Sequence, residues 1–157
     1  TVTDVELPPP FAEALDAHDV VMTYEAWRML AHERTVCWDQ LSPALQAVME
    51  RGAACSLEAY TKALEIRSRC RHSLKAAFAD VDVLLTPSAT GEAPQGLDFT
   101  GAPEFNRIWT FTGTPCVTVP GLTGPLGLPV GIQIIGPLGG DSSVIAAADW
   151  LRPLLTQ

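Results

Sequence analysis

The chain changes from helical to strand-like sequence at Val81-Asp82-Val83-Leu84-Leu85-Thr86-Pro87. This run is short, largely apolar and rich in β-branched residues, and a proline ends it, which is typical of a buried strand. Residues 11–80 contain one glycine and one proline, whereas residues 81–140 contain eleven of the twelve glycines and eight of the thirteen prolines. We therefore predict that residues 1–80 are mostly helical and that residues 81–157 form strands, a hairpin and a terminal helix.

Three helices are expected upstream of this point. The first is predicted over residues 11–34, after a run of three prolines, with one apolar face at steps of three and four. That face comprises Phe11, Leu15, His18, Met22, Ala26 and Met29. The second helix has Ser42 as its N-cap, Pro43 at its first position and Gly52 just past its end.

The third helix is predicted to begin at Ser56, with acidic residues early and basic residues late, as the helix dipole favours. Its spacing predicts a buried stripe made of Ala63, Ile66, Cys70, Leu74 and Ala77. Downstream of the strand, a long loop is expected through Ala102, because glycines and prolines interrupt any period.

A short helix is predicted over Glu104–Phe111, closed by Gly113, and two strands over residues 116–119 and 130–135. The glycine-rich segment between these strands favours an antiparallel hairpin. Asp141 is expected to cap a terminal helix that ends near Leu151. The pattern as a whole indicates an α/β fold in one domain, residues 1–157, with helices packed against a sheet.

Composition excludes several classes of protein. The 157 residues carry a net charge of −8, so we expect no general attraction to nucleic acid or to anionic lipid. No apolar run approaches the roughly 18 residues that a membrane span needs, so a soluble protein is expected. Four widely spaced cysteines without a CxxC pair favour buried free thiols over disulfides or zinc, and hence a reducing, cytoplasmic location.

The start of the chain alternates like a strand from Thr1 to Pro8 and shows no signal peptide. This pattern suggests that the chain begins inside an element and is a piece of something longer. Candidates for chemistry are sparse: His18, His32 and His72 are best explained as surface or packing residues of helices. The run 139–143, Gly-Gly-Asp-Ser-Ser, is interpreted as a strand exit and N-cap rather than an anion site.

Four motifs follow one another in the second half. They are Asp82-Val83-Leu84-Leu85-Thr86-Pro87-Ser88 with Ala93-Pro94, Phe105-Asn106-Arg107-Ile108-Trp109-Thr110, Gly113-Thr114-Pro115-Cys116-Val117-Thr118-Val119-Pro120-Gly121, and Gly127-Leu128-Pro129-Val130-Gly131-Ile132-Gln133-Ile134-Ile135-Gly136. Their content and order resemble the C-terminal part of the amidase-signature enzymes. The first half follows the family's looser pattern, with a strand from Asp4, a helix containing Glu25 and a helix containing Tyr60.

This resemblance implies a mixed β-sheet flanked by helices, incomplete in this chain, and hydrolysis or transfer of an amide nitrogen. In the family, a serine is activated by a lysine through a bridging serine, because a hydroxyl needs a neighbouring base to become nucleophilic. Those residues lie upstream of the region matched here. No catalytic residue can therefore be assigned to this chain, which is expected to be inactive alone, and no metal or cofactor is implied.

The resemblance implies that this region completes the sheet and lines the substrate cleft. Thr86 and Ser88, where a strand meets the long loop, and Asn106 and Trp109, on one face of the short helix, are the candidate substrate-binding residues. Turn chemistry or core packing is the alternative for each of them. Gln133, on an otherwise apolar strand, would need a hydrogen-bond partner if buried, and a structural role is favoured for it.

Two classes of function remain open. The first is the C-terminal part of an amidase acting on a small-molecule amide, in which the missing N-terminal part supplies the nucleophile. The second is a stand-alone, non-catalytic module that binds a partner, completes another subunit or self-associates through an exposed apolar face. Within the family, the short-helix motif looks more like general amidases than like the amidotransferase subunit. The amide substrate and the oligomeric state are not specified by the sequence.

Overall fold

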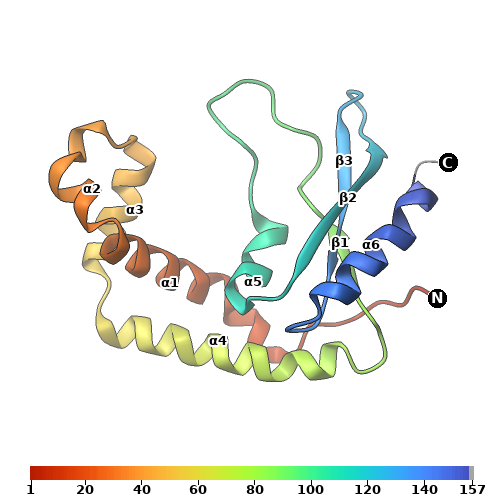
Figure 1. The fold of residues 1–157 in the computed structure, drawn as a ribbon. Helices are drawn as coiled ribbons and strands as arrows, with labels where there is room; N and C mark the ends of the chain where they lie inside the picture. Colours follow the sequence, from red (N-terminus) through yellow and green to blue (C-terminus); the bar gives the residue numbers. More distant parts are fainter. Residues whose placement is uncertain (156–157) are drawn as a thin grey trace. The chain divides into compact units, whose positions relative to one another are not determined.

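A computed structural model describes residues 1–155 of the chain, and Figure 1 shows the order of its elements. The described residues form two compact units. One unit comprises Pro10–Cys70, and the other comprises Thr1–Pro9 together with the residues from Arg71 onward.

The helical unit contains a helix that the sequence predicted as continuous and the structure divides. A 3-10 turn, Pro9–Glu13, leads into α1 (Ala14–Met29), and α2 (Ala31–Val36) follows after a break at Leu30. Arg34 folds back across the break: its Nε donates to the Trp27 carbonyl oxygen at 3.0 Å, and its guanidinium carbon lies 3.9 Å from the centre of the Trp27 ring. The prediction of a single helix over residues 11–34 was therefore wrong. The Arg34 side chain bonds to the Trp27 carbonyl at the break, and the periodicity of the sequence does not reveal this contact.

The buried face of α1 also differs from the predicted one. Its buried apolar residues are Ala14, Ala17, Val21 and Tyr24, whereas Leu15, Met22 and Met29 are exposed, Met29 by 82%. Apolar residues occur on both faces of this helix, so spacing alone selected the wrong face.

A 3-10 turn (Trp38–Gln40) leads into α3 (Pro43–Ala54), whose start is as predicted: the Ser42 side chain accepts from the Leu45 N–H at 3.3 Å. The prediction that Gly52 lies just past the end of this helix was wrong, because Gly52 lies inside the last turn and is buried. A Cβ atom on Gly52 would overlap the Thr23 carbonyl oxygen and come within 2.7 Å of Trp27 Cβ. Gly52 therefore permits close packing of α3 on α1 and does not end the helix.

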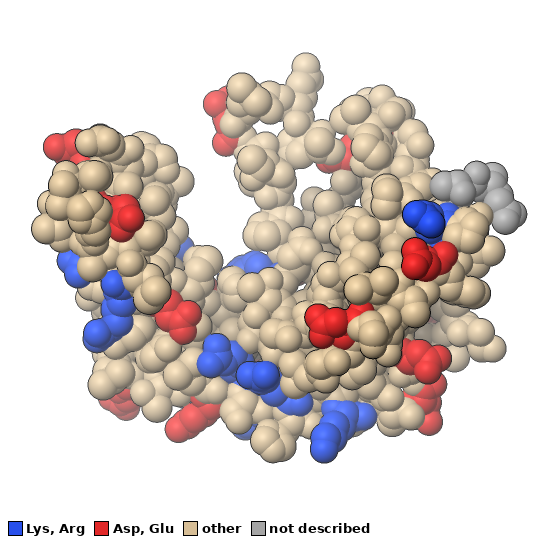
Figure 2. Space-filling view, in the orientation of Figure 1, with Lys and Arg blue, Asp and Glu red and all other residues tan. Residues whose placement is uncertain are grey.

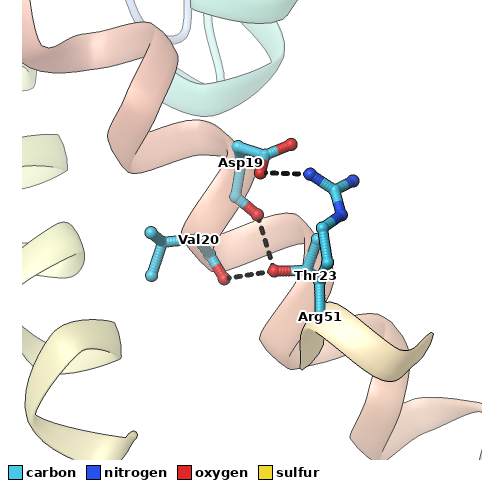
Figure 3. A network of polar contacts seen from close by, with 4 residues as sticks. All are labelled: Asp19, Val20, Thr23 and Arg51. Carbon is cyan, nitrogen blue, oxygen red and sulfur yellow. Dashed lines mark hydrogen bonds and ion pairs between the residues drawn. The ribbon is translucent and has the colours of Figure 1, made fainter. Parts of the chain in front are cut away.

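An ion pair also joins the same pair of helices (Figure 3). Arg51 Nη1 of α3 lies 2.7 Å from Asp19 Oδ2 of α1, while within α1 Thr23 Oγ1 donates to the Asp19 carbonyl at 2.8 Å. Both charged side chains are substantially exposed, so the ion pair adds little stability compared with the helix packing.

The third predicted helix is confirmed as α4 (Leu57–Ala77). Ser56 Oγ accepts from the Ala59 N–H at 3.1 Å, which caps the helix, and Glu58 and Lys75 stand in its first and last turns. All five residues of the predicted stripe are buried. Figure 2 shows basic side chains gathered over the later part of this helix and acidic side chains over its start.

The second unit is built on a three-stranded sheet in the order β1-β3-β2, with both pairs antiparallel. The strands are β1 (Leu84–Pro87), β2 (Cys116–Thr123) and β3 (Pro129–Ile135), so the predicted hairpin is confirmed. β1 begins three residues later than predicted, and its Leu85 is 43% exposed. Residues 1–8 form no strand despite their alternation, because in the described chain they pair with none of the three strands.

The two faces of this sheet differ in chemistry. On one face, α6 (Asp141–Leu155) crosses the strands, and Val144 and Leu151 pack with Val119 and Ile134 (Figure 1). Asp141 is the first residue of α6 and not its cap, because the Gly140 carbonyl already accepts from the Val144 N–H at 3.1 Å. Since side chains alternate along a strand, Gln133 points to the opposite face.

The α/β fold class is confirmed, and the mixed sheet that the resemblance implies is represented here by three antiparallel strands. Within residues 1–155, no helix is both long and apolar enough to cross a membrane.

Candidate functional site

The candidate residues lie where β1 meets the long loop and where that loop enters α5 (Glu104–Thr112). Ser88 is fixed by two bonds to one acceptor: its N–H and its Oγ donate to the Gly131 carbonyl at 3.1 and 2.8 Å. Because this hydroxyl donates to a carbonyl and not to a base, Ser88 is not an activated nucleophile.

Gln133 joins β1 to α5 from the central strand. It lies directly across from Thr86, and its Nε2 donates to Thr86 Oγ1 at 3.2 Å and to the Phe105 carbonyl at 2.8 Å. The residue is 3% exposed, so its amide satisfies the requirement for a partner that burial imposes. The structural role expected for Gln133 is confirmed.

A second set of bonds lies beside this one in the chain, because Asn106 Nδ2 donates at 3.1 Å to the carbonyl of Ser88, which is itself bonded to Gly131. Thr86, Ser88 and Asn106 are thus brought together around β1 and the start of α5. Trp109 lies one turn further along α5 and is 5% exposed, and its carbonyl accepts from the Gly113 N–H at 2.8 Å. Gly113 closes the helix with a φ of 72°, in the left-handed region, as predicted.

The cluster is uncharged. Thr86, Ser88, Asn106, Trp109 and Gln133 offer hydroxyl, amide and indole groups, which can orient a neutral polar ligand but supply neither a strong base nor a nucleophile. Every bond described above also stabilises the local backbone, so both the binding role and the packing alternative remain predictions for the four candidates.

The cysteines are all free, as expected, but of the four only Cys70 is buried. Burial raises the pKa of the Cys70 thiol, which donates to the Pro10 carbonyl at 3.4 Å. Desolvation of its sulfur likewise raises the pKa of Cys116, although that residue as a whole is exposed. Both thiols therefore stay protonated near neutral pH and are poor nucleophiles.

The glycine-rich turn before α6 has the geometry of a strand exit. Gly139 has a φ of 76° and the Gly140 N–H donates to the Pro137 carbonyl at 2.9 Å, as the strand-exit interpretation requires. Among residues 1–155, no group of three or more His, Cys, Asp and Glu side chains is arranged to hold a metal ion.

One acidic residue near this site was not distinguishable in the sequence. Glu92 accepts hydrogen bonds from the backbone of the hairpin turn between β2 and β3. The glycine at position 124 was the one feature of the sequence that could have pointed to this contact. However, no local pattern around Glu92 or Gly124 links the two residues.

The model of the amidase family matches residues 11–145, which is most of the chain. The chain belongs to the amidase family. A solved amidase superposes on it with a TM-score of 0.85 and 25% identity, over 95% of this chain and 36% of the amidase. A bacterial aryl acylamidase of the amidase-signature family gives a TM-score of 0.70 at 21% identity, over 96% and 35% of the two chains.

Among curated relatives, a glutamyl-tRNA(Gln) amidotransferase subunit from Salinibacter ruber (strain DSM 13855 / M31) is 38% identical over 88 residues. These residues are 50% of this chain and 17% of that protein. The chain therefore spans about a third of the solved amidases and a smaller share of this relative. Relatives of both kinds, amidases and amidotransferase subunits, share its sequence or fold.

Proposed function

We propose that this chain is the C-terminal part of an amidase that hydrolyses carbon–nitrogen amide bonds. The observation that carries the proposal is the family match over residues 11–145, combined with coverage of only 36% of a solved amidase. The serine nucleophile, the bridging serine and the lysine then come from sequence outside residues 1–157, and the chain alone is inactive.

Within such an enzyme, the uncharged cluster has a binding role. Thr86, Ser88 and Asn106 orient the polar amide group of the substrate, and Trp109 supports α5 from the buried side. Hydrogen bonds to the neighbouring backbone and to Gln133 support this assignment, because they hold these three side chains in fixed positions. The substrate is a small-molecule amide, the macromolecular partner is the remaining part of the amidase domain, and the location is cytoplasmic.

The test begins with the intact mass of the native gene product, followed by assay of ammonia release from a panel of simple amides. We expect a product much longer than 157 residues, with an upstream lysine and a Gly/Ser-rich segment, whose activity disappears when that lysine is replaced. The 157-residue chain alone should release no ammonia. Serine-dependent release of ammonia from the isolated chain would overturn the proposal that the catalytic residues lie outside residues 1–157.

A second candidate function is a non-catalytic module that binds a partner or self-associates. It is favoured by large apolar side chains in solvent, such as Met29 at 82%, Leu126 at 82% and Leu97 at 98% exposure. A native product of about this size that forms oligomers by light scattering would support the module, whereas a monomer at micromolar concentration would count against it.

A further inference from the structure

Residues 89–100 form an exposed loop between β1 and α5, visible in Figure 1 as the green segment between them. Of these twelve residues, Glu92 is the one that is not exposed. Hydrogen bonds that Glu92 accepts from backbone N–H groups join the loop to the β2–β3 hairpin. An acidic residue that is held more deeply than the apolar residues around it reverses the usual pattern of burial.

The partner of Glu92 is the backbone of the hairpin turn. Oε1 accepts from the Leu126 N–H at 3.0 Å and from the Leu128 N–H at 2.9 Å, and Oε2 also lies 3.0 Å from the Leu126 nitrogen. The turn is closed by its own bonds, from the Gly124 N–H to the Leu128 carbonyl and from the Gly127 N–H to the Gly124 carbonyl. Two amide groups thus converge on one carboxylate, an arrangement that gives strong, charge-assisted hydrogen bonds.

The hairpin also leaves room for this side chain. A Cβ atom on Gly124 would lie 2.5 Å from Glu92 Cδ, which is far inside van der Waals contact. Gly124 does not have a positive φ, so its conformation does not demand a glycine. The absence of a side chain at position 124 therefore serves the approach of Glu92, independently of the hydrogen bonds.

The position of this loop affects the candidate site, because the loop follows Ser88 directly in the chain and leads into α5, the helix that carries Asn106. It also carries two apolar side chains in solvent, Leu97 at 98% and Phe99 at 60% exposure. A loop anchored at one internal point presents such side chains in a defined place, where they can contact an apolar ligand.

We propose that Glu92 is a positioning residue: its clamp on the hairpin turn fixes the loop so that Leu97 and Phe99 form an apolar wall for the substrate. This inference rests on the proposed amidase function and deepens it. The substrate class is a neutral amide with an apolar alkyl or aryl acyl group, since Leu97 and Phe99 are apolar and the candidate residues Thr86, Ser88 and Asn106 are uncharged.

The clamp is tested first, without any assay of activity, by hydrogen exchange of residues 124–128 in the full-length protein. Glu92→Ala should accelerate exchange of the Leu126 and Leu128 amides by about tenfold or more, because charge-assisted bonds of this kind are lost. Asp98→Ala removes the other acidic group of the loop and is the matched control, with no acceleration expected. Unchanged exchange in Glu92→Ala would overturn the clamp.

A double-mutant cycle sharpens this test. Gly124→Ala should open the clamp by displacing the Glu92 side chain, and it should accelerate exchange as Glu92→Ala does. The double variant Glu92→Ala/Gly124→Ala should resemble Glu92→Ala, because the three atoms nearest to the added methyl group, Glu92 Cγ, Cδ and Oε1, are then absent. Fully additive effects would show that Gly124 acts on the turn by itself and would contradict the inference.

The effect on substrate is read as a split between KM and kcat. For an amide with a long alkyl or aryl acyl group, Glu92→Ala should raise KM by about tenfold with kcat within about twofold, because uniform binding is lost. The KM for acetamide should stay unchanged, and Glu92→Gln, which keeps one acceptor oxygen, should be intermediate. Accelerated exchange with an unchanged KM would overturn the substrate wall. Absence of any amide hydrolysis would overturn the proposed function and this wall, while exchange still decides the clamp.

Discussion

The backbone of Gly52 packs directly against the carbonyl group of Thr23, so that α1 and α3 meet with no side chain between them at this point. This contact explains why a glycine stands within a helix, where it normally weakens the structure. The two helices are held at a separation that an ordinary residue would not permit.

Replacing Gly52 by Ala should therefore destabilise the protein. Alanine would gain about 1 kcal/mol of helix propensity in an open position, but overlap with Thr23 and Trp27 should cost more, for a net loss of about 1–2 kcal/mol. Urea unfolding monitored by circular dichroism measures the change. Glu50→Ala, at an exposed position of the same helix, is the control and should be neutral or slightly stabilising; a stabilised Gly52→Ala variant would contradict the close packing.

Replacing Gln133 should lower the free energy of unfolding more than replacing its partner Thr86. Gln133→Leu removes a buried amide and leaves the Phe105 carbonyl without the donor that now lies at 2.8 Å, and we expect a loss of about 1–3 kcal/mol in the free energy of unfolding. Thr86→Val removes only the weaker contact at 3.2 Å and should cost less. Thermal unfolding of the two variants measures both losses. Equal losses would show that the Gln133–Thr86 hydrogen bond, and not the bond to the Phe105 carbonyl, contributes the stability.

The pKa of Tyr60 should fall when Glu25 is replaced. Tyr60 donates to Glu25 Oε1 at 2.9 Å, and this hydrogen bond, followed by burial and the carboxylate charge, raises the pKa of the phenol. Since the folded-state pKa is raised, the contribution to stability is present below the unfolded-state pKa and is lost as the pH rises through the folded-state value. Ultraviolet titration of tyrosinate in Glu25→Gln should show the lower pKa.

Tyr24 complicates that titration and also provides its control. The two tyrosine rings are stacked with centroids 4.1 Å apart, so they absorb together. Tyr24→Phe keeps the stacking and leaves Tyr60 as the single titrating phenol. A pKa in Tyr24→Phe that does not respond to Glu25→Gln would show that the hydrogen bond does not cause the shift.

Thiol labelling should distinguish Cys70 from Cys116. Cys70 is fully buried and its pKa is raised by burial, so it should react with a thiol reagent only after unfolding. Cys116 is exposed and should react in the native state, although its raised pKa slows the reaction at neutral pH. Mass spectrometry of labelled peptides locates each product, and native labelling of Cys70 at the rate of Cys116 would contradict its burial.

Features set by neighbouring residues could be predicted from the sequence. The hairpin, the α5 helix with its closing Gly113 and the buried stripe of α4 all follow from local period and from turn residues. The same logic failed at Leu30 and at Gly52, because each depends on a contact that residue spacing does not reveal: the Arg34 side chain on Trp27 in one case and the α1 backbone in the other.

The candidate site shows the same division. Its position at the end of β1 could be predicted, because Thr86 and Ser88 follow a strand signal, and family resemblance added Asn106 and Trp109. The hydrogen bonds that hold three of these residues involve Gln133 in one set and the carbonyl group of Gly131 in another, and no local pattern pairs these partners. Glu92 escaped prediction for the same reason, since its partners are backbone amides in another loop.

The order of the strands has a consequence for how the sheet is made. β2 and β3 are neighbours in sequence and can close as a hairpin as soon as both exist. β1 precedes both of them in the chain, yet its Leu84 pairs with Ile135 at the far end of β3. Pairing β1 with β3 therefore closes a long loop, which is slower and costs more conformational entropy than closing a hairpin. During translation, β1 cannot form its ladder with β3 until residues 129–135 have left the ribosome, and in this interval its β3 edge is open to chaperones and to misassembly.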